Sequence, residues 1–312
     1  MIRDWFRWTA ECNGTLAVIC KQAVARKVLQ WWWKSGQKAP VARIYVIDAK
    51  REFGATVAAC VLVCSFALSS KEQVCDVYTD TDADEVDSQF GFVDGFLVSD
   101  RAAYQAGRHL LGSAIRKWRS GIKHDAKSAL ELRGNAADLV SLDGHRVDVE
   151  RTYVFPLKKG SDLGAKSFTE RSLIVPQISI NSDTSEIAQV APKTWRYLQS
   201  KRLVFDARKS VIYRKGGPFA IFGVRPYTFS PWKVAIAALY KRLEFKVVGP
   251  DNGKPVVFDD TVYFLSFDSE SEARRMLARL QQDEVQSFLN SMIFWDDMRP
   301  VKTDILNRLD LA

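Results

Sequence analysis

The sequence predicts an α/β protein, with part of a layered α/β sheet in about the first 80 residues and a larger α+β region after it. Three observations support this. Short apolar runs flank a helical segment near the N-terminus, the second and third runs are closely connected, and the later sequence mixes short strands with helices. The chain has 312 residues, of which 47% are hydrophobic and 26% charged. This length fits one large or two ordinary domains, and we expect a first domain at 1–80 and a second at 81–312.

The N-terminal elements follow from apolar patterning. Residues 14–20 (GTLAVIC) are a continuous apolar run that is typical of a buried strand. Residues 21–34 contain no helix breaker and carry apolar side chains at helical spacing, and Gly36 marks the expected helix end. Two more strands are expected at 43–47 and within 53–66. The chain between them, about five to eight residues, is too short for a parallel crossover, which predicts antiparallel pairing.

The second region predicts both helices and strands. Pro192 suits the first turn of a helix, and Ser269 followed by Glu272 forms a capping box that opens another. We expect helices at 99–111, 182–190, 192–202, 269–281 and 284–293. We expect strands at 219–224, 233–239, 245–248 and 261–267.

Several protein classes are disfavoured. The longest apolar run covers about 14 residues, and a membrane span needs roughly 18. The first eight residues are charged where a signal peptide is apolar, so we expect a cytoplasmic protein without membrane contact. The five cysteines lack disulfide-framework spacing, and Cys60 and Cys64 are expected to be buried. No two of the three histidines have metal-ligand spacing, and all three are far in sequence from Cys60 and Cys64, so no metal site is expected.

Sequence motifs for phosphate loops and nucleophile elbows are absent. The chain contains no GxG, which a dinucleotide fingerprint needs, and no G-x-S-x-G. Asp259 and Asp260 are adjacent acids beside an expected strand. A metal-dependent nuclease is one interpretation. A turn-capping role is the other, because adjacent strand residues point to opposite faces.

Charge is concentrated in residues 193–246. This stretch holds thirteen Lys or Arg and two acids, 13 − 2 = +11, which exceeds the net +8 of the whole chain. Eleven of its 54 residues are aromatic. Cations attract phosphates through counterion release and rings stack on unpaired bases, so the composition favours nucleic-acid binding. A folded domain with a basic face and an aromatic core remains the alternative. Residues 71–100, with nine acids and one base, are expected to form a solvated connection or an acidic loop that faces away from DNA.

A set of short strings, in order along nearly the whole chain, resembles the later part of large bacterial DNA amino-methyltransferases of restriction–modification type. These enzymes use S-adenosylmethionine. The strings are KQAVARKVL (21–29), FGA (53–55), WRSGIKHD (118–125), APKTW (191–195), RKSVIY (208–213), FAIFGVRPY (219–227), WKVAI (232–236), VFDDTVYF (257–264), FLNS (288–291) and FWDDMRP (294–300).

The resemblance implies a partial Rossmann-like methyltransferase sheet followed by an α+β target recognition domain. Residues from about 14 to 80 correspond to the last strands of the sheet, whose tail is an antiparallel pair in this family. The remainder corresponds to the region that grips and reads double-stranded DNA. Such enzymes rotate the target base out of the duplex. Phe53 stands where the family places an aromatic side chain against that base; packing inside the sheet edge is the alternative.

The chain departs from the family pattern at both chemical loops. The family binds S-adenosylmethionine with a Gly-rich loop and holds the target amine with an Asn/Asp-Pro-Pro-aromatic loop. This sequence has neither GxG nor two adjacent prolines. We therefore expect it to be inactive alone, with S-adenosylmethionine bound only if a second polypeptide supplies the loops. We also expect an unpaired sheet edge and an uncovered apolar face around Leu16, Val18 and Ile19.

The predicted activity is adenine methylation within a restriction–modification or phage-defence system. A stand-alone DNA-binding or protein-interaction module without catalysis is the alternative. Candidate DNA contacts are cations of the basic stretch and of a second cluster around Trp118 and His124, where His124 is expected to be a hydrogen-bonded structural residue. These candidates are Lys209, Arg214, Lys215, Arg225 and Lys233, together with Arg119 and Lys123.

Overall fold

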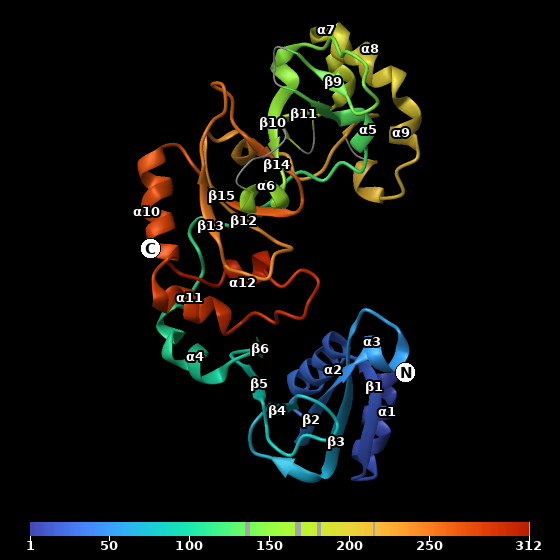
Figure 1. Ribbon diagram of the computed structural model, residues 1–312, viewed down its shortest axis with the longest axis vertical. Helices are drawn as coiled ribbons and strands as arrows, with labels where there is room; N and C mark the ends of the chain where they lie inside the picture. The colour runs from blue at the N-terminus through green and yellow to red at the C-terminus, as the bar shows by residue number, and fades with distance from the viewer. Residues whose placement is uncertain (135–137, 166–169, 180–181, 215, 312) are drawn as a thin grey trace. The chain divides into compact units, whose positions relative to one another are not determined.

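The computed structural model describes residues 1–134, 138–165, 170–179, 182–214 and 216–311. The chain forms two compact units, whose elements are labelled in Figure 1. Unit 1 contains Met1–Gly112 and Asp283–Pro300, and unit 2 contains Ser113–Gln282 and Val301–Ala312. The units divide near residue 112, whereas the sequence predicted domains at 1–80 and 81–312. The assignment of those ranges to a methyltransferase sheet and a recognition domain stays a prediction.

Unit 1 is built on a six-stranded mixed sheet with the order β1-β3-β2-β4-β5-β6. Its strands are β1 (Thr15–Lys21), β2 (Ala39–Asp48), β3 (Ala58–Ser70), β4 (Val74–Tyr78), β5 (Ser88–Val93) and β6 (Phe96–Val98). Its helices are α1 (Ile2–Glu11), α2 (Gln22–Lys34), α3 (Ala49–Phe53), α4 (Arg101–Ala106) and α11 (Asp283–Asn290), with a 3₁₀ turn at Arg108–Leu110. The acidic region 71–100 is therefore not a simple connection, because it contributes three of these strands.

The predicted antiparallel pairing of the second and third strands is confirmed. β3 lies between β1 and β2 and is antiparallel to both, with Cys60 opposite both Cys20 and Val46. α3 fills the short connection between β2 and β3, and the Asp48 carboxylate accepts hydrogen bonds from its first amides. Cys60 and Cys64 are fully buried, as predicted.

Helices α1 and α2 cover one face of this sheet. Phe6 of α1, Trp32 of α2 and Phe66 of β3 have ring centroids 5.3–5.9 Å apart and form the centre of the core. In α2 the buried positions include Ala25, Val28, Leu29 and Trp32, which is the i, i+3, i+4, i+7 spacing of one helical face. The predicted helix at 21–34 is therefore present, and Val24 and Trp31 pack at the margin of its buried face. The helix α1 was not predicted.

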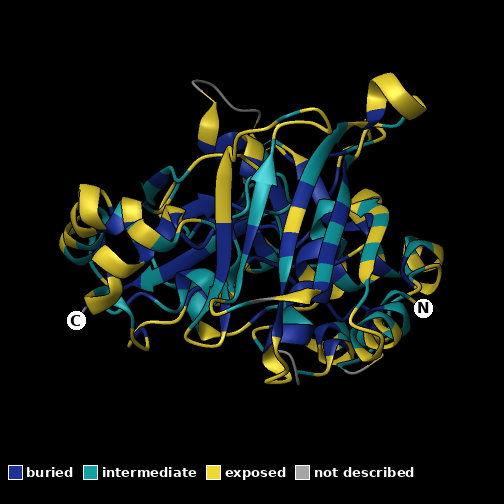
Figure 2. Ribbon diagram, turned by 90° about the horizontal axis from the view of Figure 1, so that it is seen from below, coloured by how far each residue is buried: buried dark blue, intermediate teal, exposed yellow. Residues whose placement is uncertain are grey.

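The opposite face of the sheet lies outside this core and carries an apolar row. Residues in β1 alternate along the strand between exposed and partly buried, and Figure 2 shows similar alternation on other strands. Ile19, Val61, Tyr45 and Tyr78 follow one another across β1, β3, β2 and β4, and the two tyrosine rings stack 4.7 Å apart. None of the four belongs to the cluster beneath α1 and α2, and Ile19 is 62% exposed.

This arrangement corrects one prediction. An uncovered apolar face was expected around Leu16, Val18 and Ile19 together. Leu16 and Val18 pack against the helix-covered core, and Ile19 alone of the three points to the open side. Side chains two apart in a strand share a face, whereas neighbouring side chains do not. β1 lies at the end of the described sheet, beside β3, which agrees with the expected sheet edge at this strand.

The segment Asp283–Pro300 returns to unit 1 and closes its core. Phe288 of α11 stacks on Tyr104 of α4 with ring centroids 5.4 Å apart. The Arg26 guanidinium, on a side chain 7% exposed, donates to Asp296 and Asp297 at 2.7 Å each. The ring of Phe294 lies 4.4 Å from the same guanidinium carbon. The string FWDDMRP is therefore explained by packing in unit 1.

Unit 2 contains two further sheets, with the orders β14-β10-β11-β8-β9 and β13-β12-β15-β7. The first has β8 (Glu131–Arg133), β9 (Val140–Ser141), β10 (Val154–Lys158), β11 (Arg171–Ile174) and β14 (Val257–Phe258). The second has β7 (Arg119–Ser120), β12 (Trp232–Ala237), β13 (Phe245–Val248) and β15 (Val262–Phe267). The helices are α5 (Lys127–Leu130), α6 (Gly160–Gly164), α7 (Ile187–Val190), α8 (Pro192–Ser200), α9 (Arg202–Asp206), α10 (Glu270–Leu280) and α12 (Thr303–Leu306). Short 3₁₀ turns lie at Arg151–Tyr153, Thr184–Glu186, Val211–Tyr213 and Pro226–Phe229.

Most predicted elements of this unit are present, with one clear exception. Ser269 accepts a hydrogen bond from the Glu272 amide at the start of α10, as the capping pattern predicted. Residues 219–224 do not form the expected strand. They form a loop joined to Lys123 through Phe222 by one antiparallel bridge, and Gly223 has a positive φ of 85° that interrupts extended structure. In the part of the chain that is described, no helix is both long and apolar enough to cross a membrane.

Candidate nucleic-acid interface

The structure separates the cations of residues 193–246 into neutralised, buried and exposed groups. Five are paired with carboxylates at N–O distances of 2.8–3.4 Å. These are Lys193, Lys201, Arg202, Arg242 and Lys246, with the partners Asp148, Asp143, Asp206 and, for the last two, Glu244. Their charge is largely balanced within the protein, so they contribute less to a phosphate-binding field.

Arg208 is a scaffold residue. Its guanidinium donates to the carbonyl oxygens of His124, Ala220 and Pro218, and its carbon lies 4.1 Å from the ring centroid of Tyr213. Burial lowers the pKa of this guanidinium. The contacts join three segments that are distant in sequence, around residues 124, 208–213 and 218–220.

Lys233 requires a correction. Its side chain is buried in β12, with the residue 1% exposed, and its ammonium donates to the Ser230 carbonyl oxygen beneath the ring of Phe264. Burial lowers the pKa of Lys233 to about 7. A phosphate cannot reach this group in the structure, so the prediction that Lys233 contacts DNA is wrong. The sequence predicted a strand at Lys233 but did not indicate which face of that strand is buried in the protein.

Three of the predicted contacts are exposed cations without a carboxylate partner among the described residues. They are Lys209, Arg214 and Arg225, and each is in the exposed class. Lys209 and Arg214 flank the 3₁₀ turn Val211–Tyr213, and Arg225 precedes the turn Pro226–Phe229. Lys215 lies outside the described residues.

Backbone contacts hold the second candidate cluster against the same loops. Lys123 and Phe222 exchange two backbone hydrogen bonds of 2.8 and 3.0 Å. A Cβ on Gly223 would lie 3.0 Å from the carbonyl oxygen of Gly121, so glycine permits the close approach. We call the exposed cationic side chains and the exposed ring on residues 119–125, 209–214 and 219–225 the cationic loop surface. It comprises Arg119, Lys123, Lys209, Arg214, Phe222 and Arg225.

The remaining members of the surface supply charge and a ring. Arg119 is exposed on β7 with its guanidinium carbon 5.3 Å from the ring centroid of Tyr227. The Lys123 ammonium is 3.9 Å from Asp125, at the outer limit of an ion pair, and both side chains are more than 40% exposed. The Phe222 ring is 40% exposed. An exposed ring among unbalanced cations combines stacking with phosphate attraction.

His124 is a structural residue, as expected. It is 7% exposed, its Nδ1 accepts a hydrogen bond from the Ala126 amide, and its Nε2 lies 3.4 Å from Glu131. The Lys159 ammonium is 2.7 Å from the same carboxylate. Burial alone would raise the pKa of Glu131, but hydrogen bonds from His124 and Lys159 outweigh it and lower that pKa. This network fixes the start of the loop that carries Lys123.

The carboxylate of Asp259 is engaged in a turn. It accepts hydrogen bonds from the amide and hydroxyl of Thr261, and burial raises its pKa. Among the described residues, no group of three or more His, Cys, Asp or Glu side chains is arranged to hold a metal ion. The hydrogen bonds to Thr261 agree with the turn-capping interpretation of Asp259.

Phe53 ends α3 in the connection between β2 and β3, and it is 59% exposed. Gly54 follows in the left-handed conformation with φ of 65° and ends the helix. The ring is therefore displayed at the sheet end and is not packed inside the sheet edge. Its predicted contact with a flipped base stays a prediction.

Comparison with known proteins gives one extended sequence match. No protein-family model matches the chain. The chain is 41% identical over 302 residues, 96% of its length, to the type II methyltransferase M.NspV of Nostoc sp. (strain ATCC 29411 / PCC 7524). It spans 63% of the length of that relative.

A solved structure shares the fold. The type IIL restriction–modification enzyme MmeI, determined in complex with DNA, superposes with a TM-score of 0.59 at 12% identity. The match covers 98% of this chain and 41% of MmeI. The sequence similarity confirms the resemblance that the sequence strings indicated: this chain is related over almost its whole length to a type II methyltransferase and has a mixed α/β fold similar to that of a restriction–modification enzyme.

Proposed function

We propose that this chain is the target-recognition part, with the closing strands of the catalytic sheet, of an S-adenosylmethionine-dependent DNA adenine methyltransferase of a restriction–modification or defence system. The observation that carries the proposal is the cationic loop surface, where Lys209, Arg214 and Arg225 are exposed and have no carboxylate partner among the described residues. The 41% identity to a type II methyltransferase supports methyl transfer to DNA as the reaction. The proposal implies a cytoplasmic location, where bacterial DNA is found.

The strand order of unit 1 supports a catalytic sheet that continues beyond β1. The antiparallel pair β2-β3 agrees with the antiparallel pair that the family resemblance implied for the tail of the sheet, and β1 lies on the other side of β3. The open side of that sheet carries the apolar row Ile19, Val61, Tyr45 and Tyr78. Exposed rows of this kind are stabilised when another element covers them.

The chemical loops are proposed to lie outside these 312 residues. The sequence holds no GxG and no adjacent prolines, so the donor-binding loop and the loop that holds the target amine are not found in it. We propose that a further segment or a second polypeptide provides both, pairs with the edge of β1 and covers the face around Ile19. S-adenosylmethionine binds only in that assembly. Phe53, displayed at the same sheet, then contacts the rotated adenine.

Complementation tests this proposal. The chain is mixed with a polypeptide corresponding to the part of M.NspV that this chain does not match, and transfer of labelled methyl groups to duplex DNA is measured. We expect no transfer by either component alone and N6-methyladenine in the digested product of the mixture. Duplex binding by the chain without transfer in any mixture would instead support a DNA-binding module without catalysis. N4-methylcytosine as the product would contradict the adenine assignment.

An Ile19→Glu variant tests the docking face separately. A charge on the open sheet face is expected to abolish complementation and to leave DNA binding by the chain unchanged, because Ile19 belongs to unit 1 and the cationic loop surface to unit 2. Ile115→Glu is the matched control, since Ile115 is 80% exposed in unit 2. Equal loss of complementation in both variants would contradict the proposed face.

A further inference from the structure

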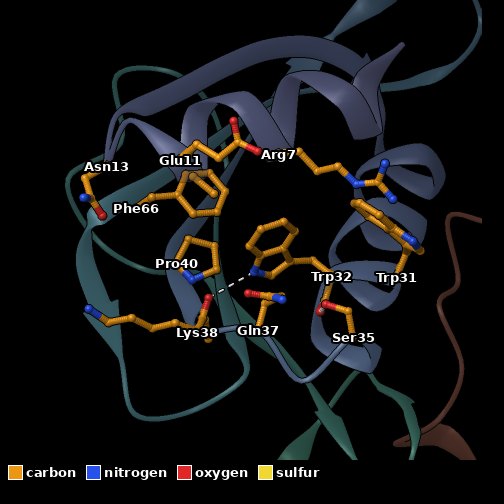
Figure 3. A pocket seen from close by; sticks show the side chains of 12 residues that line it. Arg7, Glu11, Asn13, Trp31, Trp32, Ser35, Gln37, Lys38, Pro40 and Phe66 are labelled. Atoms are coloured by element: carbon orange, nitrogen blue, oxygen red, sulfur yellow. Dashed lines mark hydrogen bonds between the residues drawn. The ribbon is translucent and has the colours of Figure 1, made fainter.

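An open pocket of about 500 Å³ lies in unit 1 between α1, the end of α2 and the start of β2 (Figure 3). Ligand sites in proteins commonly span about 300–1,000 Å³. The pocket is separate from Phe53 in sequence and from every residue of the cationic loop surface, and nothing in the proposed methyl transfer uses it. Its lining combines rings with groups of both charges.

The apolar wall of the pocket is rigid. Trp32, Phe66 and Pro40 face the hollow, and the rings of Trp32 and Phe66 meet edge-on with centroids 5.3 Å apart. Trp32 is 6% exposed, and its indole N–H donates to the Lys38 carbonyl oxygen at 3.0 Å, which fixes the ring. Both rings are 6% exposed, so the parts that they leave open, together with Pro40, form an apolar floor against which a planar ring can pack.

The rim above these rings carries polar groups from α1 and the turn after it. Glu11, Arg7 and Asn13 line it, and Figure 3 shows Glu11 and Arg7 on the side opposite Pro40 and Trp32. The guanidinium carbon of Arg7 lies 5.3 Å from the ring centroid of Trp31. Glu11 has no ion pair among the described residues. A carboxylate beside an aromatic wall can accept hydrogen bonds from an exocyclic amine of a bound ring.

A second hollow of about 440 Å³ adjoins the first across a shared wall formed by Gln37, Lys38 and Ala39. It is lined by Lys71 and by the ion pair of Arg101 and Glu72, whose atoms are 2.5 Å apart. Lys38 and Lys71 are exposed and have no carboxylate partner in the part of the chain described. The second hollow therefore presents net positive charge directly beside the aromatic one.

We propose that these adjoining hollows form a binding site for a free purine nucleoside monophosphate. The base stacks in the aromatic hollow, its exocyclic amine donates to Glu11, and its phosphate lies between Lys38 and Lys71. Because the two hollows share a wall, one small ligand can place its ring in the first hollow and its phosphate in the second. None of these residues belongs to the cationic loop surface, so different variants test the two sites.

Calorimetric titration of the full chain with AMP, adenosine and inorganic phosphate tests the site. We expect saturable binding of AMP, at least tenfold weaker binding of adenosine, and still weaker binding of phosphate. Lys38→Glu should weaken AMP binding about tenfold or more and change adenosine binding less than twofold, whereas Glu11→Gln should weaken both. Lys27→Glu, an exposed change on α2 outside the pocket, is the matched control.

Three outcomes would overturn the proposal. Absence of saturable AMP binding at millimolar concentration removes the site. Equal affinity for AMP and adenosine removes the phosphate position. Loss of AMP binding in Lys27→Glu equal to that in Lys38→Glu shows a general charge effect. A fourth outcome would also overturn the proposal: tighter binding of a short single-stranded oligonucleotide than of AMP would identify a strand end as the ligand. Circular dichroism of each variant establishes that the fold is kept.

Discussion

The Arg26 cluster allows a quantitative prediction for stability. One guanidinium nitrogen of Arg26 serves both Asp296 and Asp297 at 2.7 Å, and the Phe294 ring lies 4.4 Å from the guanidinium carbon. Breaking a fully buried ion pair costs about 3–5 kcal/mol, because an uncompensated charge remains. The carboxylates keep 27% and 17% exposure and can rehydrate, so the cost is reduced. We expect Arg26→Met to lower the free energy of unfolding by about 2–3 kcal/mol.

The shared nitrogen also predicts strong non-additivity. Asp296→Asn and Asp297→Asn should each cost about 1 kcal/mol or less, because the other carboxylate still balances Arg26. The double variant should exceed the sum by about 1 kcal/mol, since it leaves the buried guanidinium without an anion. Urea unfolding gives the free energies, and hydrogen exchange of the α2 amides assigns them to unit 1.

Two results would contradict these stability predictions. A cost below about 0.5 kcal/mol for Arg26→Met would show that the cluster contributes no more than an ordinary surface pair. Strictly additive Asn variants would show that the two carboxylates act independently. Lys27→Met, on the next residue of α2 and exposed, is the control and should change stability by less than about 0.5 kcal/mol.

Three further predictions concern function and pH. Phe53→Ala should leave stability within about 0.5 kcal/mol, because the ring is 59% exposed, and should sharply reduce methyl transfer in the complemented assembly; unchanged transfer would remove its proposed role. The depressed pKa of Lys233, about 7, means that the unfolded state binds the proton more strongly. Unfolding free energy should therefore rise by about 1.4 kcal/mol per pH unit between pH 7 and 10, and Lys233→Met should abolish that rise. Arg208→Met should weaken DNA binding by disordering the loops while leaving the salt dependence of binding unchanged, and a reduced salt slope would show direct phosphate contact instead.

The sequence predicted most of the sheet tail because its signals are local. The apolar runs of β1, β2 and β3, and the short connection between the latter two, required no knowledge of tertiary contacts. The return of Asp283–Pro300 to unit 1 was not predictable in this way, because it depends on Arg26 meeting residues about 270 positions later. Residues 219–224 have strand-like composition, but the positive φ of Gly223 and a single bridge to Lys123 make them a loop.

The candidate site was predicted in composition but not in detail. Arg208 and Lys209 are adjacent and look alike in the sequence, yet Arg208 is partly buried and bound to backbone carbonyls, whereas Lys209 is exposed. Lys233 looked like another surface charge because a strand pattern does not reveal what covers each face. Phe222 is one of eleven aromatic residues in 193–246, and the sequence did not distinguish it from the others. Its 40% exposure in the structure places it on the cationic loop surface.

The salt dependence of duplex binding measures how many phosphates the cationic loop surface neutralises. The logarithm of the association constant, plotted against the logarithm of salt concentration, falls with a slope of about −0.9 for each phosphate neutralised. Changing Lys209, Arg214 and Arg225 together to Gln should make the slope less steep by about 2.7, whereas Arg275→Gln, at an exposed position of α10, should leave the slope unchanged. Absence of duplex binding at low ionic strength, or an unaltered slope in the triple variant, would contradict the proposed interface.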